Sequence, residues 1–250
     1  QAGDVDTVKK LLAANASVEV TNKAGKTALQ LAADEDHKAV VQLLGNVADT
    51  DDNSAVATAA QNDDVELLNK LIASKAALTG HNALGQTPLM LASRNGCVAA
   101  VQALLDARVN FRARDGDGFT AAAEAAHHGH IDVLRVLVKA RASLNSANNQ
   151  GQTPLMLAAD GGHADVVQFL VDAGADLDEC ESEGFTALAI ATSTGLRNIV
   201  EILVSANADL NVHNHVGETA LIAAAANGHV DVVKLLLDAN ADTDIASKSG

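Results

Sequence analysis

The chain contains few aromatic residues, prolines and cysteines, and no long apolar run. Only 2% of its 250 residues are aromatic, with no Trp or Tyr, and it has two Pro and two Cys. Cys97 and Cys180 lie far apart in the sequence, so we expect neither a disulfide framework nor a metal cluster. Reduced thiols indicate an intracellular, cytoplasmic protein. No apolar run reaches the length of a membrane-spanning helix, so we expect no membrane insertion.

Basic residues are also scarce, and the acidic excess is uneven. The net charge is −15, of which residues 1–80 contribute −5, residues 81–147 contribute +2 and residues 148–250 contribute −12. This distribution should repel nucleic acid and acidic lipid, and it favours a basic partner. The alternative interpretation is solubility, because acidic residues keep an Ala-rich chain from associating with itself. We expect a monomer.

What the chain has in abundance is a period of 33 residues. Glycines precede a series of threonines by two residues, and further glycines follow each threonine by nine. The threonines are Thr87, Thr120, Thr153, Thr186 and Thr219. A fixed period of this length predicts a solenoid, in which each unit is too small to bury its own apolar face and must stack on its neighbours.

One unit, residues 148–180, predicts two helices and a projecting hairpin. Thr153 can cap a short helix with Pro154 at its first position, and Gly162 can end that helix. A second helix is expected to begin near His163 and to end at Gly174, which suits a C-terminal cap. Its buried face would consist of Val166, Val167, Phe169, Leu170 and Val171.

These motifs resemble the ankyrin repeat. The sequence Thr-Pro-Leu-Met-Leu-Ala occurs at 87–92 and 153–158, and Gly-His occurs at 129–130, 162–163 and 228–229. The resemblance covers essentially the whole chain. It implies an all-α ankyrin-repeat solenoid of stacked helix–turn–helix units with projecting β-hairpin fingers. A single array is expected over 1–250, with a partial repeat at 1–21, repeats at 22–48, 49–81, 82–114, 115–147, 148–180, 181–213 and 214–246, and a further repeat starting at 247–250.

Some positions depart from the family pattern. Asp36 and Asp63 stand where glycine is expected, so the first two repeats should be less regular. The segment before Ser54 is too short for a full hairpin, which predicts a truncated finger there. Glu124 occupies a position that tolerates polar residues in this family and is expected to face the groove. Both ends look cut, which indicates a fragment of a longer array.

Motifs for catalysis or for cofactors are weak or missing. The pair Lys26-Thr27 follows a glycine, but the second glycine of a phosphate-binding loop is replaced by Val20. His127 and His128 lie near a histidine that the repeat pattern explains, and metal ligation would need converging ligands. We therefore expect no enzyme activity, no cofactor and no metal.

The resemblance places partner-binding residues beside each turn glycine and near the end of each first helix, on a concave surface of fingers and inner helices. These residues are Arg112, Arg114, Asp117, Phe119, Glu124, His127, His128, Asn149, Gln150, Gln152, Asp160, Asp178, Glu179, Glu181, Glu183, Phe185, Ser193, Thr194, His213, His215, Val216 and Glu218.

The finger 176–183 is the most acidic of these segments. We expect Asp176 to be structural, and we expect the other four acids to bind Arg or Lys of a ligand. Those four are Asp178, Glu179, Glu181 and Glu183. An extended ligand could place its acidic part near Arg108, Arg112 and Arg114, two units earlier. Phe119 and Phe185 either anchor the partner or pack on a neighbouring finger.

The predicted function is a non-catalytic protein-interaction module that binds a protein or an extended peptide, with a basic segment, on its finger and inner-helix surface. The alternative is a regulatory or targeting segment of a larger enzyme or channel that acts within its own polypeptide. An independent enzyme and a designed array are further hypotheses. Variation at Arg108, Arg141 and Asn207, where a consensus would have glycine, argues against design.

Overall fold

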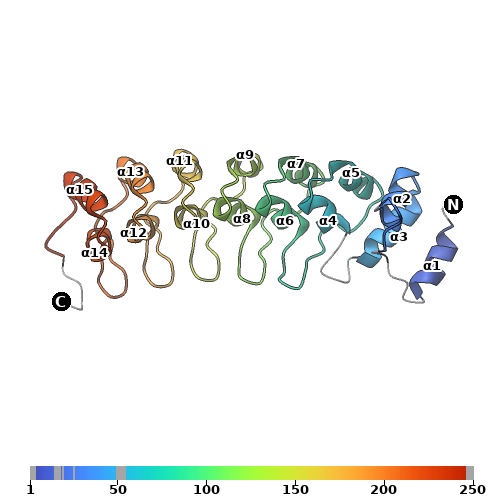
Figure 1. The fold of residues 1–250 in the computed structure, drawn as a ribbon, viewed down its shortest axis with the longest axis horizontal. Helices are drawn as coiled ribbons and strands as arrows, with labels where there is room; N and C mark the ends of the chain where they lie inside the picture. Colours follow the sequence, from blue (N-terminus) through green and yellow to red (C-terminus); the bar gives the residue numbers. More distant parts are fainter. Residues whose placement is uncertain (1–3, 14–17, 19, 25, 49–54, 246–250) are drawn as a thin grey trace. The chain divides into compact units, whose positions relative to one another are not determined.

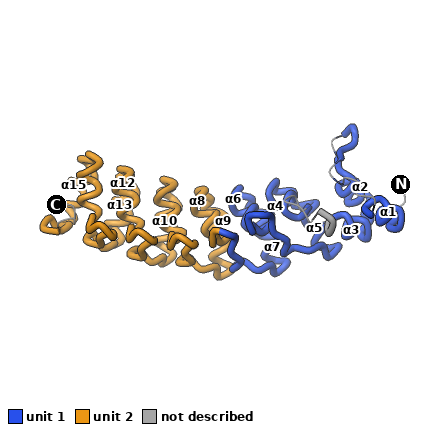
Figure 2. Tube along the Cα trace, turned by 90° about the horizontal axis from the view of Figure 1, so that it is seen from below, with its two compact units in different colours: residues 1–116 blue, residues 117–250 orange. Residues whose placement is uncertain are grey.

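The computed structural model describes residues 4–13, 18, 20–24, 26–48 and 55–245, and this part of the chain is helical with no β-strand (Figure 1). Contacts divide the chain into two compact units, unit 1 (Gln1–Gly116) and unit 2 (Asp117–Gly250), coloured in Figure 2. The shortened finger predicted before Ser54 and the two chain ends lie outside the described residues.

One pair of helices falls in each full predicted repeat. Unit 1 contains α1 (Val5–Ala13), α2 (Ala28–Asp34), α3 (Lys38–Ala48), α4 (Ala55–Gln61), α5 (Val65–Ala73), α6 (Pro88–Arg94) and α7 (Val98–Asp106). Unit 2 contains α8 (Ala121–His127), α9 (Ile131–Lys139), α10 (Pro154–Asp160), α11 (Ala164–Asp172), α12 (Ala187–Ser193), α13 (Arg197–Ser205), α14 (Ala220–Ala226) and α15 (Val230–Asp238).

The first helix of most repeats begins at a threonine cap, as the sequence predicts. The Thr153 hydroxyl accepts a hydrogen bond from the backbone N–H of Met156, and Pro154 occupies the first helical position. The same cap is present at Thr27, Thr87, Thr120, Thr186 and Thr219. Each cap satisfies a backbone N–H that the helix itself cannot satisfy, so it fixes where the helix starts.

The second helices bury a narrow stripe. In α11 the buried residues are Val166, Val167 and Leu170, which lie on one side of the helix. Two residues that the pattern also assigned to the buried face, Phe169 and Val171, are only half-buried. The Phe169 ring instead lies under the guanidinium of Arg135, 5.0 Å from the ring centroid.

Helices of this length are marginal alone, so stacking supplies their stability. In unit 2 the first helices α8, α10, α12 and α14 pack in one row, and the second helices α9, α11, α13 and α15 pack in another (Figure 1). Alanines fill the first row and permit close approach; Ala125, Ala158 and Ala191 are fully buried. The fingers project from this row of first helices (Figure 1).

Left-handed backbone recurs at fixed positions, whether or not the residue is glycine. Asp36 and Asp63 both have a φ of 54°, beside 73° for Gly96 at the equivalent turn. The expected irregularity of the first two repeats is therefore wrong for the backbone at this turn, because Asp is among the residues that tolerate the left-handed region. Arg108 and Asn207 also adopt the left-handed conformation, after the ends of second helices, with φ of 61° and 65°.

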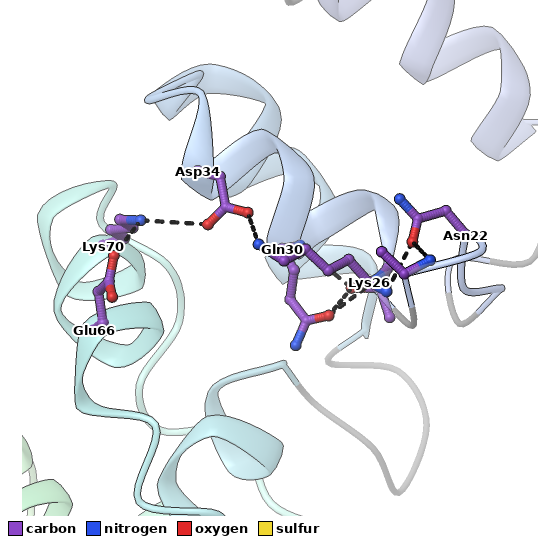
Figure 3. Close-up of polar contacts among 8 residues, drawn as sticks. Asn22, Lys26, Gln30, Asp34, Glu66 and Lys70 are labelled. Atoms are coloured by element: carbon purple, nitrogen blue, oxygen red, sulfur yellow. Dashed lines mark hydrogen bonds and ion pairs between the residues drawn. The ribbon is translucent and has the colours of Figure 1, made fainter.

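In unit 1 an ion-pair network ties the loop before α2 to α2 and α5 (Figure 3). The Lys26 ammonium donates to Asp34, and Lys70 lies between Asp34, at 3.8 Å, and Glu66, at 2.9 Å. The hydrogen bond from Lys26 is the main cause that lowers the pKa of the exposed Asp34 carboxyl. Thr27 forms a capping box with α2, so it is explained without a phosphate ligand.

Candidate functional site

The fingers of unit 2 are tight turns closed by one side chain. The Asn148 Oδ1 accepts hydrogen bonds from the backbone N–H groups of Gln150 and Gln152, at 3.0 and 2.9 Å. Asn214 makes the same pair of bonds two repeats later. The predicted β-hairpins are thus short turns, and the described residues contain one isolated β-bridge, within the last of these fingers.

Two side chains predicted to contact a partner are bound within their own fingers. The Asn148 Nδ2 donates to Gln152 Oε1 at 2.9 Å, and Asn214 Nδ2 donates to Glu218 Oε2 at 3.0 Å. Gln152 and Glu218 are half-buried. Their positions therefore have a structural role that the sequence did not predict.

Glu181 replaces asparagine at the same finger position. Its Oε1 accepts hydrogen bonds from the backbone N–H groups of Glu183 and Phe185, at 2.9 and 3.0 Å, and its Oε2 accepts one from the Ser182 hydroxyl at 3.1 Å. The longer Glu side chain thus reaches the same two amides that Asn reaches in the other fingers. This carboxylate shapes the finger, which is a role different from the predicted contact with a ligand.

Backbone hydrogen bonds join neighbouring fingers of unit 2. Each bond runs from an N–H at one fingertip to a carbonyl of the preceding fingertip. The bonds are Asn149 N to Asp117 O at 2.9 Å, Ser182 N to Gln150 O at 2.8 Å, and His215 N to Glu183 O at 3.0 Å. The fingertips are thereby fixed in register, side by side (Figure 1).

A second ladder runs along the bases of the fingers. The Asp178 Oδ1 accepts the backbone N–H of Asp209 at 2.8 Å, so Asp178 is also engaged inside the protein. The equivalent bonds join Asn145 with Asp176 and Asn211 with Asp242. The sequence carries a signal for this ladder, because Asn or Asp recurs at 145, 178 and 211 with the 33-residue period.

Glu179 and Glu183 are thus distinct from the other acids of the finger. Both are exposed, and their side-chain carboxylates make no hydrogen bond or ion pair with the residues that the structure describes. They flank the fixed turn at Glu181. Two carboxylates are therefore held on a rigid finger and turned to solvent.

The negative charge of this finger affects the pKa of the Cys180 thiol. Cys180 is exposed. Partial burial raises the pKa of its thiol, and the carboxylates of Glu179, Glu181 and Asp178 raise it further. The thiolate is disfavoured because a fourth negative charge would form beside three existing ones.

Glu179→Lys is therefore expected to speed the alkylation of Cys180 by iodoacetamide at pH 7.5 at least about twofold, because a lower thiol pKa gives more thiolate. The rate can be followed by mass spectrometry of the intact protein. Cys97 is buried and its thiol pKa is also raised, so it should react slowly and serve as an internal reference. Glu201→Lys, on the exposed side of α13, is the charge-matched control and should leave the rate unchanged.

Aromatic side chains gather at the first finger of unit 2. The Phe119 ring stacks on His127 with centroids 6.1 Å apart, and His127 lies 5.0 Å from His128. The His128 Nδ1 lies 3.0 Å from the backbone oxygen of Glu124. Phe119 is half-buried and packs on His127 of its own repeat, whereas the packing alternative expected contact with a neighbouring finger. That Phe119 anchors a partner stays a prediction.

The expectation that Glu124 faces the groove is wrong. Only 3% of Glu124 is exposed. It lies on the buried side of α8, at the position where the equivalent residue of α10 is the buried Leu157. Its Oε2 is 3.6 Å from the Nδ1 of His128, one turn later on the same helix.

The remaining predicted residues of unit 2 lie on fingers or at the ends of first helices. Asp117, Asn149, Gln150, Asp160, Thr194, His213, His215 and Val216 are exposed, and Phe185 and Ser193 are half-buried. The hydroxyls of Ser193 and Thr194 donate to the Ile190 carbonyl within α12. We call the fingers 148–152, 178–185 and 214–218 the finger face of unit 2.

Arg112 and Arg114 belong to unit 1. The Arg112 guanidinium lies over the ring of Phe111, 5.6 Å from its centroid. Both arginines are exposed. That one ligand contacts these arginines and the acidic finger stays a prediction.

Within the described ranges, no group of three or more His, Cys, Asp or Glu side chains is arranged to hold a metal ion. No helix in the described part of the chain is long and apolar enough to cross a membrane.

The comparisons with known proteins agree with this geometry. A family model for ankyrin repeats matches residues 1–77, 56–148, 108–179, 140–214 and 179–249. The chain belongs to the ankyrin-repeat family. Its structure is similar to an ankyrin repeat domain from Acinetobacter baumannii AYE, with 31% identity, a TM-score of 0.69, and coverage of 75% of this chain and 98% of that one.

A second similar structure is the ankyrin repeat domain of Bcl-3, a member of the IkappaB family. It has 26% identity and a TM-score of 0.73, and the match covers 80% of this chain and 91% of that domain. A search of curated proteins gave no significant match. Ankyrin repeats are in general protein-interaction modules and typically non-catalytic.

Proposed function

We propose that the finger face of unit 2 binds a segment of another protein that carries Lys or Arg, and that the chain acts as a monomeric, non-catalytic binding module. The observation that carries this proposal is the separation of roles within one acidic finger. Glu181 and Asp178 hold the backbone, whereas Glu179 and Glu183 are exposed on it. Charged oxygens on a fixed turn can pair with a basic side chain at a low cost in conformational entropy.

The surrounding charge supports the same partner chemistry. Residues 148–250 carry a net charge of −12, so a basic segment would be attracted over a range longer than one ion pair. Exposed ion pairs contribute mainly to association rate and specificity. Affinity also needs apolar contacts, and the finger face offers the half-buried Phe185 and the exposed Val216 beside the carboxylates.

A peptide selection tests the proposal. Phage-displayed random peptides would be selected against the whole chain, and enriched peptides would be synthesised with a fluorescent label for anisotropy titrations. We expect Lys- or Arg-rich peptides whose Kd rises at least about tenfold in Glu179→Lys/Glu183→Lys, roughly 1.4 kcal/mol of binding free energy. Binding should also weaken as salt is raised.

The control variant has the same change in net charge on the second helices. Glu201→Lys/Asp238→Lys alters two exposed acids on the second helices α13 and α15, outside the fingers, and Kd should change by less than about threefold. Equal losses in the two double variants would show that only net charge matters. Enrichment of peptides without basic residues would contradict the proposed partner chemistry.

A further inference from the structure

Unit 1 contains a pocket of about 250 Å³, lined by residues between 78 and 89 and between 109 and 114. Its walls come from two consecutive repeats. Leu78 comes from the repeat 49–81, and Leu89, Val109 and Ala113 come from the repeat 82–114. Leu89 is buried and Leu78 and Val109 are half-buried, so the floor is apolar and already formed by the packed repeat core.

Two basic side chains line the same pocket. His81 and Arg114 are both exposed and both contribute to its wall. The Nδ1 of His81 lies 3.2 Å from the backbone oxygen of Asn82, which orients the ring. Arg114 carries five N–H donors, so its guanidinium can bind a carboxylate and keep other contacts.

The local charge is opposite to that of the acidic finger. Residues 75–116 contain five Lys and Arg and two Asp or Glu. The region is therefore basic within a chain whose net charge is −15. An acidic ligand group would be attracted here, and a basic one would be repelled.

The volume decides what size of group fits. Sites for whole small molecules and cofactors usually measure about 300–1,000 Å³. A pocket of about 250 Å³ lies below that range, and it suits a single apolar side chain. Its basic rim would then meet the residue next to that side chain.

We propose that this pocket binds a protein segment in which a Leu-sized or Phe-sized apolar residue is followed or preceded by Asp or Glu. The apolar side chain enters between Leu89 and Val109, and the carboxylate pairs with Arg114. The inference goes beyond the proposed function, because it assigns a second site with opposite charge preference on unit 1. It needs no simultaneous contact with the finger face of unit 2.

The test separates the pocket from general charge attraction. Labelled synthetic peptides with one Leu flanked by Glu residues would be titrated against the whole chain by fluorescence anisotropy. Matched peptides would have Ala in place of Leu, or Gln in place of Glu. We expect binding only when both features are present, and a Kd at least about tenfold higher in Arg114→Glu.

Lys75→Glu is the control, because it makes the same charge change at an exposed residue of unit 1 that is not part of the pocket wall. It should raise Kd by less than about threefold. Equal losses in Arg114→Glu and Lys75→Glu would overturn the proposal, as would equal binding of the Ala-containing peptide. Since Glu179→Lys/Glu183→Lys should leave these acidic peptides bound, the two proposals can fail independently.

Discussion

Replacement of Gly184 by Ala is expected to lower the free energy of unfolding by roughly 2–4 kcal/mol. Gly184 has a φ of 90°, in the left-handed region, where a Cβ is strained. A Cβ at this position would lie 2.9 Å from the Cα of Asn214 and 3.1 Å from the backbone N of His215. Both are backbone atoms of the next finger, so no side-chain rotation relieves the clash and the fingertip ladder must open. Urea denaturation followed by circular dichroism measures the loss.

Gly174→Ala is the matched control for that effect. Gly174 also has a positive φ, 82°, but an added Cβ would meet no atom within 4 Å. Asn207 and Asn240 occupy the equivalent positions of the next repeats with φ of 65° and 64°, so residues with a Cβ are accepted there. The substitution should therefore cost about 1 kcal/mol, the strain of left-handed Ala without a clash. Equal destabilisation by the two substitutions would mean that backbone conformation alone, rather than contact between fingers, sets the requirement for glycine.

Hydrogen exchange locates the change within the array. A repeat protein can unfold in parts, so one global transition does not identify the weakened repeat. In Gly184→Ala, amides of the fingers 181–185 and 214–218 should exchange faster, including the Ser182 and His215 amides that form the ladder. Protection of α9 should stay close to that of the parent.

Gly174 and Gly184 show what could and could not be predicted from the sequence. The period, the threonine caps and the helix ends follow from residue types whose backbone preferences are strong, so they were predicted and confirmed. The difference between Gly174 and Gly184 depends on how closely the next finger approaches. The distance between the glycine and the next finger is set by how the repeats pack, so it cannot be read from the local sequence.

The candidate site was predicted less completely for the same reason. The finger was identified from its charge, but charge alone does not distinguish Glu181, which binds its own backbone, from Glu183, which is exposed. Glu181 stands at the position of Asn148 and Asn214, and that alignment was the signal that could have revealed its role. Glu124 was misplaced because a polar residue was taken as exposed, although its equivalent Leu157 lies in the core.

The acidic side chains of unit 2 have two different roles: some bind the protein's own backbone, and others are exposed to solvent. Some of the carboxylates of unit 2 accept hydrogen bonds from backbone N–H groups, as at Asp178 and Glu181. The composition therefore overstates how many carboxylates a partner could reach. Counting exposed, unengaged groups leaves Glu179 and Glu183 on the acidic finger, which is why the binding test changes only these two.

Replacement of His163 by Leu is expected to lower the free energy of unfolding by about 1–2 kcal/mol. The His163 ring lies at the start of α11 but does not cap that helix. Its Nε2 lies 3.0 Å from the backbone oxygen of His127 in the preceding repeat, and His229 makes the same contact with Ser193 at 3.1 Å. The ring therefore joins neighbouring repeats, and its loss leaves a carbonyl oxygen without that partner.

The leucine substitution tests this hydrogen bond separately from packing, because a leucine already occupies the equivalent position of the next repeat. Leu196 stands one repeat later, and its side chain lies 3.9 Å from the point that a Cβ on Gly162 would occupy, so the space can hold an aliphatic side chain. His229→Leu should cost a similar amount, whereas His213→Leu, at an exposed finger residue, should cost less than about 0.5 kcal/mol. Thermal and urea unfolding of the three variants supply the comparison. A cost for His163→Leu no larger than that for His213→Leu would show that the hydrogen bond from the His163 ring does not stabilise the contact between these repeats.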